Sequence, residues 1–144
     1  MTAYLFDTMA HAAAMSGMPE KWRRAWKEVT IGHKSLILLE PLVAEMTSKL
    51  SPRIGIARAR QRILWLKSLR NTSVVSPDDN EAIEAGFAKM RYKAAGLSLV
   101  DAFILTIARR QGAKVFTTDR GLRDTCRESK VEVDFLPLEE LSSE

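Results

Sequence analysis

The sequence predicts an α/β fold in which a parallel sheet of about five strands is sandwiched between helices. Short apolar runs with the character of strands alternate along the chain with longer segments of helical character. The runs are apolar throughout instead of alternating with polar residues, which is typical of parallel strands buried on both faces. The chain has 144 residues, of which 46% are hydrophobic. This length and composition predict one domain that spans residues 1–144.

The first half of the chain contains two apolar runs, each followed by two helical segments. In chain order we expect a strand at 3–6, helices at 9–15 and 20–28, a strand at 36–39, and helices at 41–50 and 56–69. Pro19 and Pro41 occupy positions at which proline favours the first turn of a helix. The pair Ser51-Pro52 is expected to end the helix that Pro41 begins, because proline lacks the amide that the helix needs. Ile56 and Trp65 contribute to an apolar stripe on the helix that follows.

The second half repeats this alternation and ends on strands. We expect a strand at 73–75, a helix that begins at Pro77 and carries Ile83, Phe87 and Met90, helices at 98–111 and 122–128, and strands at 113–116 and 131–135. Ser76 is the expected N-cap of the first of these helices, with Pro77 as its first residue. Gly112 is expected to end the helix at 98–111 in the left-handed conformation that glycine adopts readily. The predicted order is therefore β-α-α-β-α-α-β-α-α-β-α-β.

Composition excludes several classes of protein. The single cysteine, Cys126, excludes an internal disulfide and a cysteine-based zinc site. No apolar run approaches the ~20 residues that span a bilayer, and the beginning MTAYLFD has an acid where a signal peptide needs a basic region. We therefore expect a cytoplasmic protein without membrane association. Nucleophile motifs such as G-x-S-x-G are absent, and neither His11 nor His33 has a context that indicates a base or a metal ligand.

Basic residues are concentrated in one part of the chain. The net charge is +4, and the stretch from residue 49 to 70 contains lysines and arginines but no acid. Its arginines are weak candidates for contacts with a phosphate backbone, although a solvated helix face explains each of them singly. These candidates are Arg53, Arg58, Arg60 and Arg62.

Acidic residues offer the clearest candidate chemistry. Asp7 and Asp119 each follow an apolar run that a helix succeeds, so parallel strands would bring them to one edge of the sheet if the two strands are neighbours. Asp101 is the only charge in the apolar first half of its helix, three residues after Ser98. Helix capping is the alternative for all three aspartates. Glu40 and Glu45 flank the start of a further helix. Carboxylates that converge in one crevice need cations to ionise together, and their hard oxygen atoms favour Mg²⁺ or Mn²⁺.

Three segments together resemble the PIN domain, most closely the VapC-type toxin ribonucleases of toxin–antitoxin pairs. They are YLFDT (residues 4–8), PLVAEMTSKLSPRIG (41–55) and LSLVDAFILTIARRQGAKVFTTD (97–119). The resemblance covers essentially the whole chain in the same order. By this likeness the family's acids fall on Asp7, Glu45, Asp101 and Asp119. Glu45 is preferred to Glu40 because a leucine five residues later and a glycine ten residues later match relatives.

The resemblance implies a function and a set of partners. It implies a Mg²⁺-dependent endoribonuclease, with Mn²⁺ as a further candidate metal, in which Asp7, Asp101, Asp119 and Glu45 hold the metal. Thr8, Ser98 and Thr118 would lie next to these carboxylates without binding the metal themselves. The family usually has two small polar residues after its first aspartate, whereas here Met9 follows Thr8. The resemblance further implies an RNA substrate, a cognate antitoxin protein and a homodimer, with the faces of Trp22, Trp26 and Trp65 as candidate interfaces or as ordinary core.

Other readings of the same residues remain. The same acids would serve an RNA-processing nuclease that has no antitoxin. A binding module with this fold and without turnover is the alternative from another class, although a repulsive acidic cluster argues against it. A receiver-type phosphoacceptor domain needs an acidic pair after the first strand and a lysine at a strand end, and the sequence has neither.

Overall fold

The computed structural model describes residues 2–15, 19–137 and 139. Its elements follow the predicted order, and all five strands are parallel. The strands are β1 (Ala3–Phe6), β2 (Ser35–Leu39), β3 (Thr72–Val75), β4 (Lys114–Thr117) and β5 (Val133–Phe135). The helices are α1 (Thr8–Met15), α2 (Glu20–Thr30), α3 (Glu40–Ile54), α4 (Ile56–Ser68), α5 (Asp79–Arg91), α6 (Leu99–Gln111) and α7 (Arg120–Glu128), with a short 3₁₀ turn η1 (Lys93–Ala95). The α/β prediction is confirmed.

The strand order is β3-β2-β1-β4-β5, so the chain builds outward from β1 in one direction and then continues on its other side. β1 and β4 are neighbours in parallel register, with Leu5 opposite Val115 and Phe6 opposite Phe116. The order therefore reverses between β1 and β4. In open α/β sheets, the crevice beyond the carboxyl ends of the strands at such a reversal is the usual place for a ligand site.

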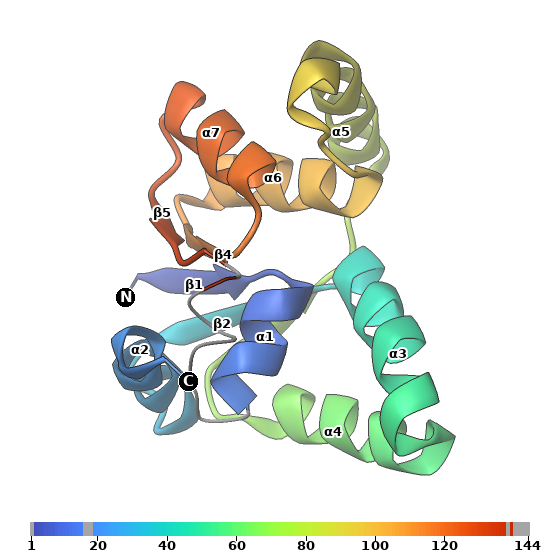
Figure 1. The fold of residues 1–144 in the computed structure, drawn as a ribbon, viewed down its shortest axis with the longest axis vertical. Coiled ribbons are helices and arrows are strands. Elements are labelled where there is room, and N and C mark those ends of the chain that lie inside the picture. The colour runs from blue at the N-terminus through green and yellow to red at the C-terminus, as the bar shows by residue number, and fades with distance from the viewer. Residues whose placement is uncertain (1, 16–18, 138, 140–144) are drawn as a thin grey trace.

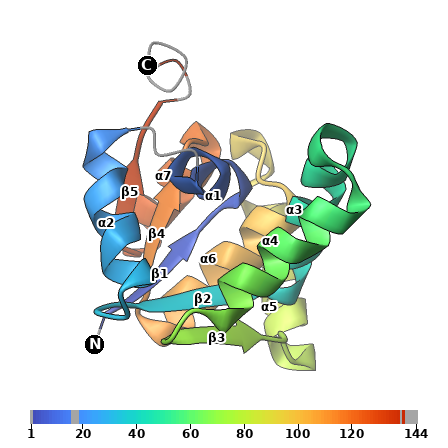
Figure 2. The same cartoon turned by 90° about the horizontal axis from the view of Figure 1, so that it is seen from below.

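Helices cover both faces of the sheet. Figure 1 shows α5, α6 and α7 on one side and α1, α2 and α4 on the other, while α3 stands beside both layers. Figure 2 shows the sheet from the side of α1, α2 and α4, with β3 at one edge and β5 at the other. No helix in the described residues is both long and apolar enough to cross a membrane.

The inner strands β1, β2 and β4 are buried along nearly their whole length, as the continuous apolar runs predict. Phe6 and Phe116 stack with their ring centroids 4.3 Å apart, so β1 packs against β4 near the carboxyl ends of both strands. Edge strand β3 is only partly covered. This packing sets the positions of the two polar residues that follow, Asp7 after Phe6 and Thr117 after Phe116.

Two predicted helix boundaries are wrong. Helix α3 does not end at Leu50 but continues to Ile54, with Pro52 inside it. This is tolerated because Pro52 and the preceding turn face solvent, where water can bind the carbonyl group that proline leaves without an amide. Helix α5 begins after Asp78 and not after Ser76, because Asp78 and Glu81 form a reciprocal capping box with hydrogen bonds of 2.7 and 2.9 Å.

Some apolar residues at helical spacing do not belong to the core. Ile83, Phe87 and Met90 form an exposed stripe on α5, which instead packs through Ala85 and Ala88. Ile56 is likewise exposed at the start of α4. Periodicity locates these helices correctly, but it does not distinguish the face toward the sheet from a face that remains open.

Candidate active site

Asp7 directly follows β1 at the point where the strand order reverses. Its carboxylate is buried and accepts hydrogen bonds from the backbone N–H of Ala10, at 2.8 Å, and from the hydroxyl of Thr117. The first bond caps α1, so the capping role considered for this residue is present. Burial raises the pKa of Asp7 to about 6, against the opposing effect of these hydrogen bonds.

Asp101 lies in the first turn of α6, which packs against β1 and β4. The Ser98 hydroxyl caps the helix by accepting a hydrogen bond from the Asp101 backbone N–H at 3.1 Å. Burial, first, and then the nearby charges of Asp7 and Asp119 together raise the pKa of the Asp101 carboxyl to about 7. A hydrogen bond between the Asp101 and Asp119 carboxyl groups acts in the same direction, while the Ser98 hydroxyl lowers the pKa. Asp101 therefore faces the other two aspartates.

Asp119 has two roles. It is the N-cap of α7, and its carboxylate accepts hydrogen bonds from the backbone N–H groups of Gly121 and Leu122, both at 3.3 Å. The same carboxyl group interacts with Asp101 and contributes to the raised pKa of Asp7. The cap thus orients the Asp119 carboxylate toward Asp7, which follows β1, and Asp101, which lies in α6. Helix capping and participation in the site are therefore compatible for Asp119.

Glu45 joins this group through a hydroxyl. The Thr8 hydroxyl donates to Glu45 Oε1 at 2.5 Å, which connects the second turn of α3 to the residue after Asp7. Lys49 Nζ lies 3.8 Å from the same carboxylate oxygen. Glu40, in contrast, is exposed at the first position of α3. The structure therefore brings Glu45, and not Glu40, to the edge where Asp7 begins α1.

The hydroxyl groups are placed as predicted in part. Thr8 supports Glu45 and Ser98 supports the Asp101 turn, whereas Thr118 contributes its backbone N–H to Asp7. Thr117 was not among the residues predicted from the sequence. This fully buried residue donates from its hydroxyl to Asp7, and the same oxygen accepts from the Asp119 backbone N–H at 2.9 Å. No sequence signal singles it out: its role follows from the strand register of the structure, in which Phe6 lies opposite Phe116 and Asp7 therefore lies opposite Thr117.

The chemistry of the donor set fits a hard divalent cation. The charge of Asp119 raises the pKa of Asp7, and the charges of Asp7 and Asp119 raise the pKa of Asp101, a repulsion that a bound cation would relieve. Oxygen donors of this kind suit Mg²⁺ or Mn²⁺. Within the described residues, however, no three His, Cys, Asp or Glu side chains have the arrangement of a finished metal site. A cation would therefore have to draw the carboxylates together.

Neither His11 nor Cys126 supplies a base or a nucleophile to this site. His11 is buried between Phe6 and Trp26, neither of its ring nitrogens has a hydrogen-bond partner among the described residues, and burial lowers its pKa to about 3. It is therefore a neutral core residue. Cys126 is fully buried, and burial raises the pKa of its thiol to about 12. Such a thiol is not a nucleophile.

The predicted arginines and tryptophans separate into different environments. Arg53 is exposed near the end of α3, and Arg58, Arg60 and Arg62 are exposed on α4. Arg58 and Arg62 line a groove of about 590 Å³ together with Gln61, Trp26 and Trp65. Trp22 is wrong as an interface candidate, because its ring is fully buried and its indole N–H donates to Asp134 at 3.0 Å.

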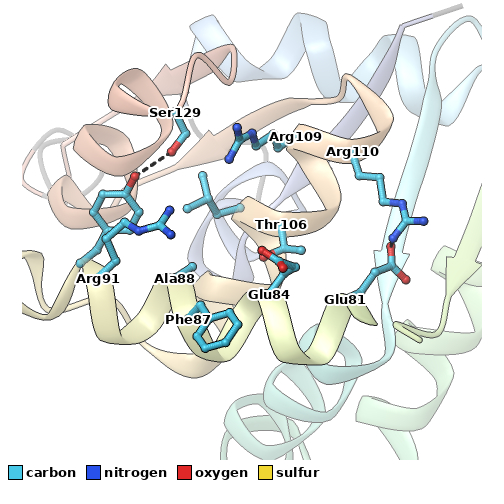
Figure 3. Close-up of a pocket in the computed structure, with 11 residues that line it drawn as sticks. Glu81, Glu84, Phe87, Ala88, Arg91, Thr106, Arg109, Arg110 and Ser129 are labelled. Carbon is cyan, nitrogen blue, oxygen red and sulfur yellow. Dashed lines mark hydrogen bonds and ion pairs between the residues drawn. The ribbon is translucent and has the colours of Figure 1, made fainter. Parts of the chain in front are cut away.

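A second hollow of about 340 Å³ lies between α5 and α6, at the end of α6 that is distant from Asp101 (Figure 3). Arg91 and Arg109 extend into it, while Glu81 forms an ion pair with Arg110 at 3.7 Å at its rim. Glu84 also lines it. Its charges are mixed, and none of the predicted acids of the site belongs to it.

Comparisons with known proteins agree with this geometry. The PIN domain family matches residues 4–128. The fold is similar to that of the Rickettsia felis VapBC2 complex solved on a DNA fragment from its promoter (TM-score 0.69, 12% identity, 94% of this chain and 99% of that one). It is also similar to Mycobacterium tuberculosis VapC20, described as a sarcin–ricin loop cleaving toxin (TM-score 0.70, 17% identity, 85% and 94% coverage).

A third similar structure is the DNA-bound VapBC of Salmonella typhimurium (TM-score 0.68, 18% identity, 94% and 98% coverage). No curated protein matches the sequence. The identities to the solved structures are low, so these likenesses show the fold, whereas the family match covers most of the chain. With the sheet order, the strand-end acids and this match in agreement, the chain belongs to the PIN domain family.

Proposed function

We propose that this chain is a ribonuclease that depends on Mg²⁺ or Mn²⁺ and acts as the toxin of a VapBC-type toxin–antitoxin pair. The observation that carries the proposal is the convergence of Asp7, Asp101 and Asp119 where the strand order reverses, with the pKa of both Asp7 and Asp101 raised. A cluster of carboxyl groups whose charges raise one another's pKa destabilises the fold, which favours a functional role for the cluster. The similarity to VapBC structures supports the toxin assignment.

The residues of the chain would divide the work as follows. Asp7, Asp101 and Asp119 would hold the cation, with Glu45 contributing from α3 through its contact with Thr8. When bound, the cation would lower the pKa of a water molecule and offset charge on the phosphate. Thr117 holds Asp7 and the Asp119 backbone in register, so two of the carboxylates keep their relative orientation. The α7 cap fixes the rotamer of Asp119.

Partners follow from the same proposal. An antitoxin protein would block the acidic edge, and a basic side chain inserted among the carboxylates would do so by charge complementarity. A homodimer is a further part of the proposal. The exposed stripe Ile83, Phe87 and Met90 on α5 suits such an interface better than the buried Trp22 does.

The test is cleavage of total cellular RNA by the purified protein with Mg²⁺, with Mn²⁺ and with excess chelator. Wild type should cut only with a metal, and Asp7→Asn should lower the rate by at least about a hundredfold because it removes a charge that holds the cation. Asp79→Asn is the matched control, since Asp79 is an exposed acid in the first turn of α5. Full activity in chelator, or an unchanged rate for Asp7→Asn, would refute the proposal.

A further inference from the structure

The groove between α2 and α4 is lined in a way that no structural role requires. Trp65 is 45% exposed, although burial of so large an aromatic ring would stabilise the fold. Its ring centroid lies 6.3 Å from that of Trp26 with an interplanar angle of 51°, so the two indoles form a continuous aromatic corner. The groove holds about 590 Å³, within the range of sites that accept small organic groups.

The charge of the groove has one sign. Arg58 and Arg62 stand one helical turn apart on α4, and Trp65 follows about one turn after Arg62; the neutral Gln61 also lines the groove. Among the residues that the structure describes, no acid lines the groove, and none occurs in the sequence from residue 49 to 70. The hollow between α5 and α6 differs in this respect, because two glutamates offset its arginines. The groove therefore combines an open aromatic face with uncompensated positive charge.

This combination suits single-stranded nucleic acid. Every nucleobase has a face that stacks on an indole, and flanking guanidinium groups neutralise the phosphates on either side of the stacked base. An aliphatic peptide segment would find few aliphatic side chains in the lining, and a duplex would keep its bases paired and out of reach. Charge and aromatic content together thus favour an unpaired stretch of polynucleotide.

The groove is joined to the candidate active site through the core. The Trp26 ring packs against Phe6, with centroids 5.4 Å apart, and against His11 at 5.7 Å. Phe6 immediately precedes Asp7, and the His11 backbone N–H donates to the Asp7 carbonyl at 2.9 Å. The segment that carries Asp7 therefore packs against Trp26, which lines the groove. RNA bound in the groove would thus contact the same packed unit that positions Asp7.

We infer that the groove formed by Trp26, Arg58, Gln61, Arg62 and Trp65 is an accessory site that stacks an unpaired base of the RNA substrate and holds its flanking phosphates. This inference rests on the proposed ribonuclease function and specifies the form of its substrate. Trp65 supplies the stacking face, and Arg58 and Arg62 supply the phosphate contacts. Cleavage would then favour RNA with a single-stranded segment beside the scissile bond.

The experiment measures binding separately from cleavage. Fluorescence anisotropy in chelator gives the affinity for a labelled single-stranded RNA of about 12 nucleotides, within the site sizes known for single-strand binding. Trp65→Ala should weaken binding by about fivefold to a hundredfold, the loss expected for one base–aromatic stack, and Trp65→Phe should restore most of it. Leu64→Ala is the matched control, because Leu64 is an exposed apolar neighbour on the same helix outside the groove.

The arginines are tested by salt dependence. Arg58→Gln combined with Arg62→Gln should make the slope of log affinity against log salt shallower by about 0.7 for each phosphate that the protein no longer neutralises. Arg91→Gln combined with Arg109→Gln changes the charge equally at the hollow of Figure 3 and should leave binding nearer to that of wild type. These four arginines are exposed, so the variants should fold even if Trp65→Ala does not.

Each outcome decides the inference. Weaker binding of single-stranded RNA by both groove variants, with unchanged binding of the matching duplex, supports it. Wild-type affinity for single-stranded RNA in both groove variants overturns it. If those variants instead lose only the binding of an antitoxin, the inference is also overturned, because the groove is then a protein-docking site. Failure of the wild-type protein to cleave any RNA would refute the proposed function, whereas this binding comparison would still be interpretable.

Discussion

Replacement of Asp101 by asparagine should make the metal-free protein more stable at neutral pH. The pKa of this carboxyl is raised from 3.8 to about 7 by burial and by the neighbouring Asp7 and Asp119. The folded chain therefore takes up a proton that the unfolded chain releases, and the free energy of unfolding falls as pH rises from about 4 to about 7. Asparagine has nearly the same shape and no charge, so the variant should lack this decline.

The structure sets the size of the effect. A pKa that rises from 3.8 to about 7 corresponds to about 4 kcal/mol at about 1.36 kcal/mol per pH unit. Asp101 is partly open to solvent, which screens the repulsion, so we expect the variant to gain about 2 kcal/mol at pH 8. For a chain of this length that corresponds to a rise of about 7 °C in Tm.

The assay is urea unfolding of wild type and variant in chelator between about pH 5 and pH 8. The difference in unfolding free energy should be smallest at the acid end and largest above pH 7, and added Mg²⁺ should stabilise wild type more than the variant. Asp79→Asn serves as control, since loss of that exposed charge at the start of α5 should cost about 0.3–1 kcal/mol. An Asp101→Asn variant less stable than wild type at pH 8 would show that the carboxylate mainly serves its helix, which refutes this reasoning.

Further substitutions test other parts of the site. Glu45→Gln should slow RNA cleavage at least about tenfold more than Glu40→Gln in initial-rate assays, because Glu45 contacts Thr8, the residue after Asp7, whereas Glu40 is exposed; the reverse ranking would mean that α3 is oriented differently. Gly121→Ala should destabilise the fold by about 1–3 kcal/mol in denaturant, since its Cβ would lie 2.2 Å from a backbone carbonyl oxygen, whereas Gly86→Ala in an open helix position should stabilise it by about 0.5–1 kcal/mol. Equal effects at the two glycines would contradict the close approach. Thr117→Val should raise the pKa of Asp7 and shift the acidic limb of the pH–rate profile to higher pH, because the hydroxyl that lowers this pKa is removed. An unshifted limb would show that the Thr117–Asp7 hydrogen bond is absent from the active form.

The sequence predicts the order of elements because the inner strands are short apolar runs separated by capped helices. Ser98, Gly112 and Pro41 have a local meaning that does not depend on distant residues, and all three act at helix ends as expected. The pairing of β1 with β4 is different. Sequence alone made the meeting of Asp7 and Asp119 conditional on that pairing, and the structure supplies it.

The features that sequence reasoning missed depend on tertiary surroundings. Pro52 is tolerated inside α3 because its turn faces water. For Trp22 the sequence left interface and core open, and the structure places its ring in the core, with the indole N–H donating to Asp134 of β5. Thr117 gains its role only when the register of two distant strands places it beside Asp7. Local composition carries no record of these partners, so the supporting hydroxyl was assigned to the adjacent Thr118.

The position of β1 in the middle of the sheet has a consequence for synthesis of the protein. Asp7 and the Thr117 hydroxyl that orients it are separated by 110 residues. At about 5–20 residues per second, a ribosome needs roughly 5–20 seconds to travel between them. During that interval the nascent chain has made Asp7, Glu45 and then Asp101, but it has neither β4 beside β1 nor the Asp119 cap of α7. The proposed ribonuclease therefore stays inert beside the messenger and ribosome that produce it until β4 and the beginning of α7 have emerged and joined the sheet.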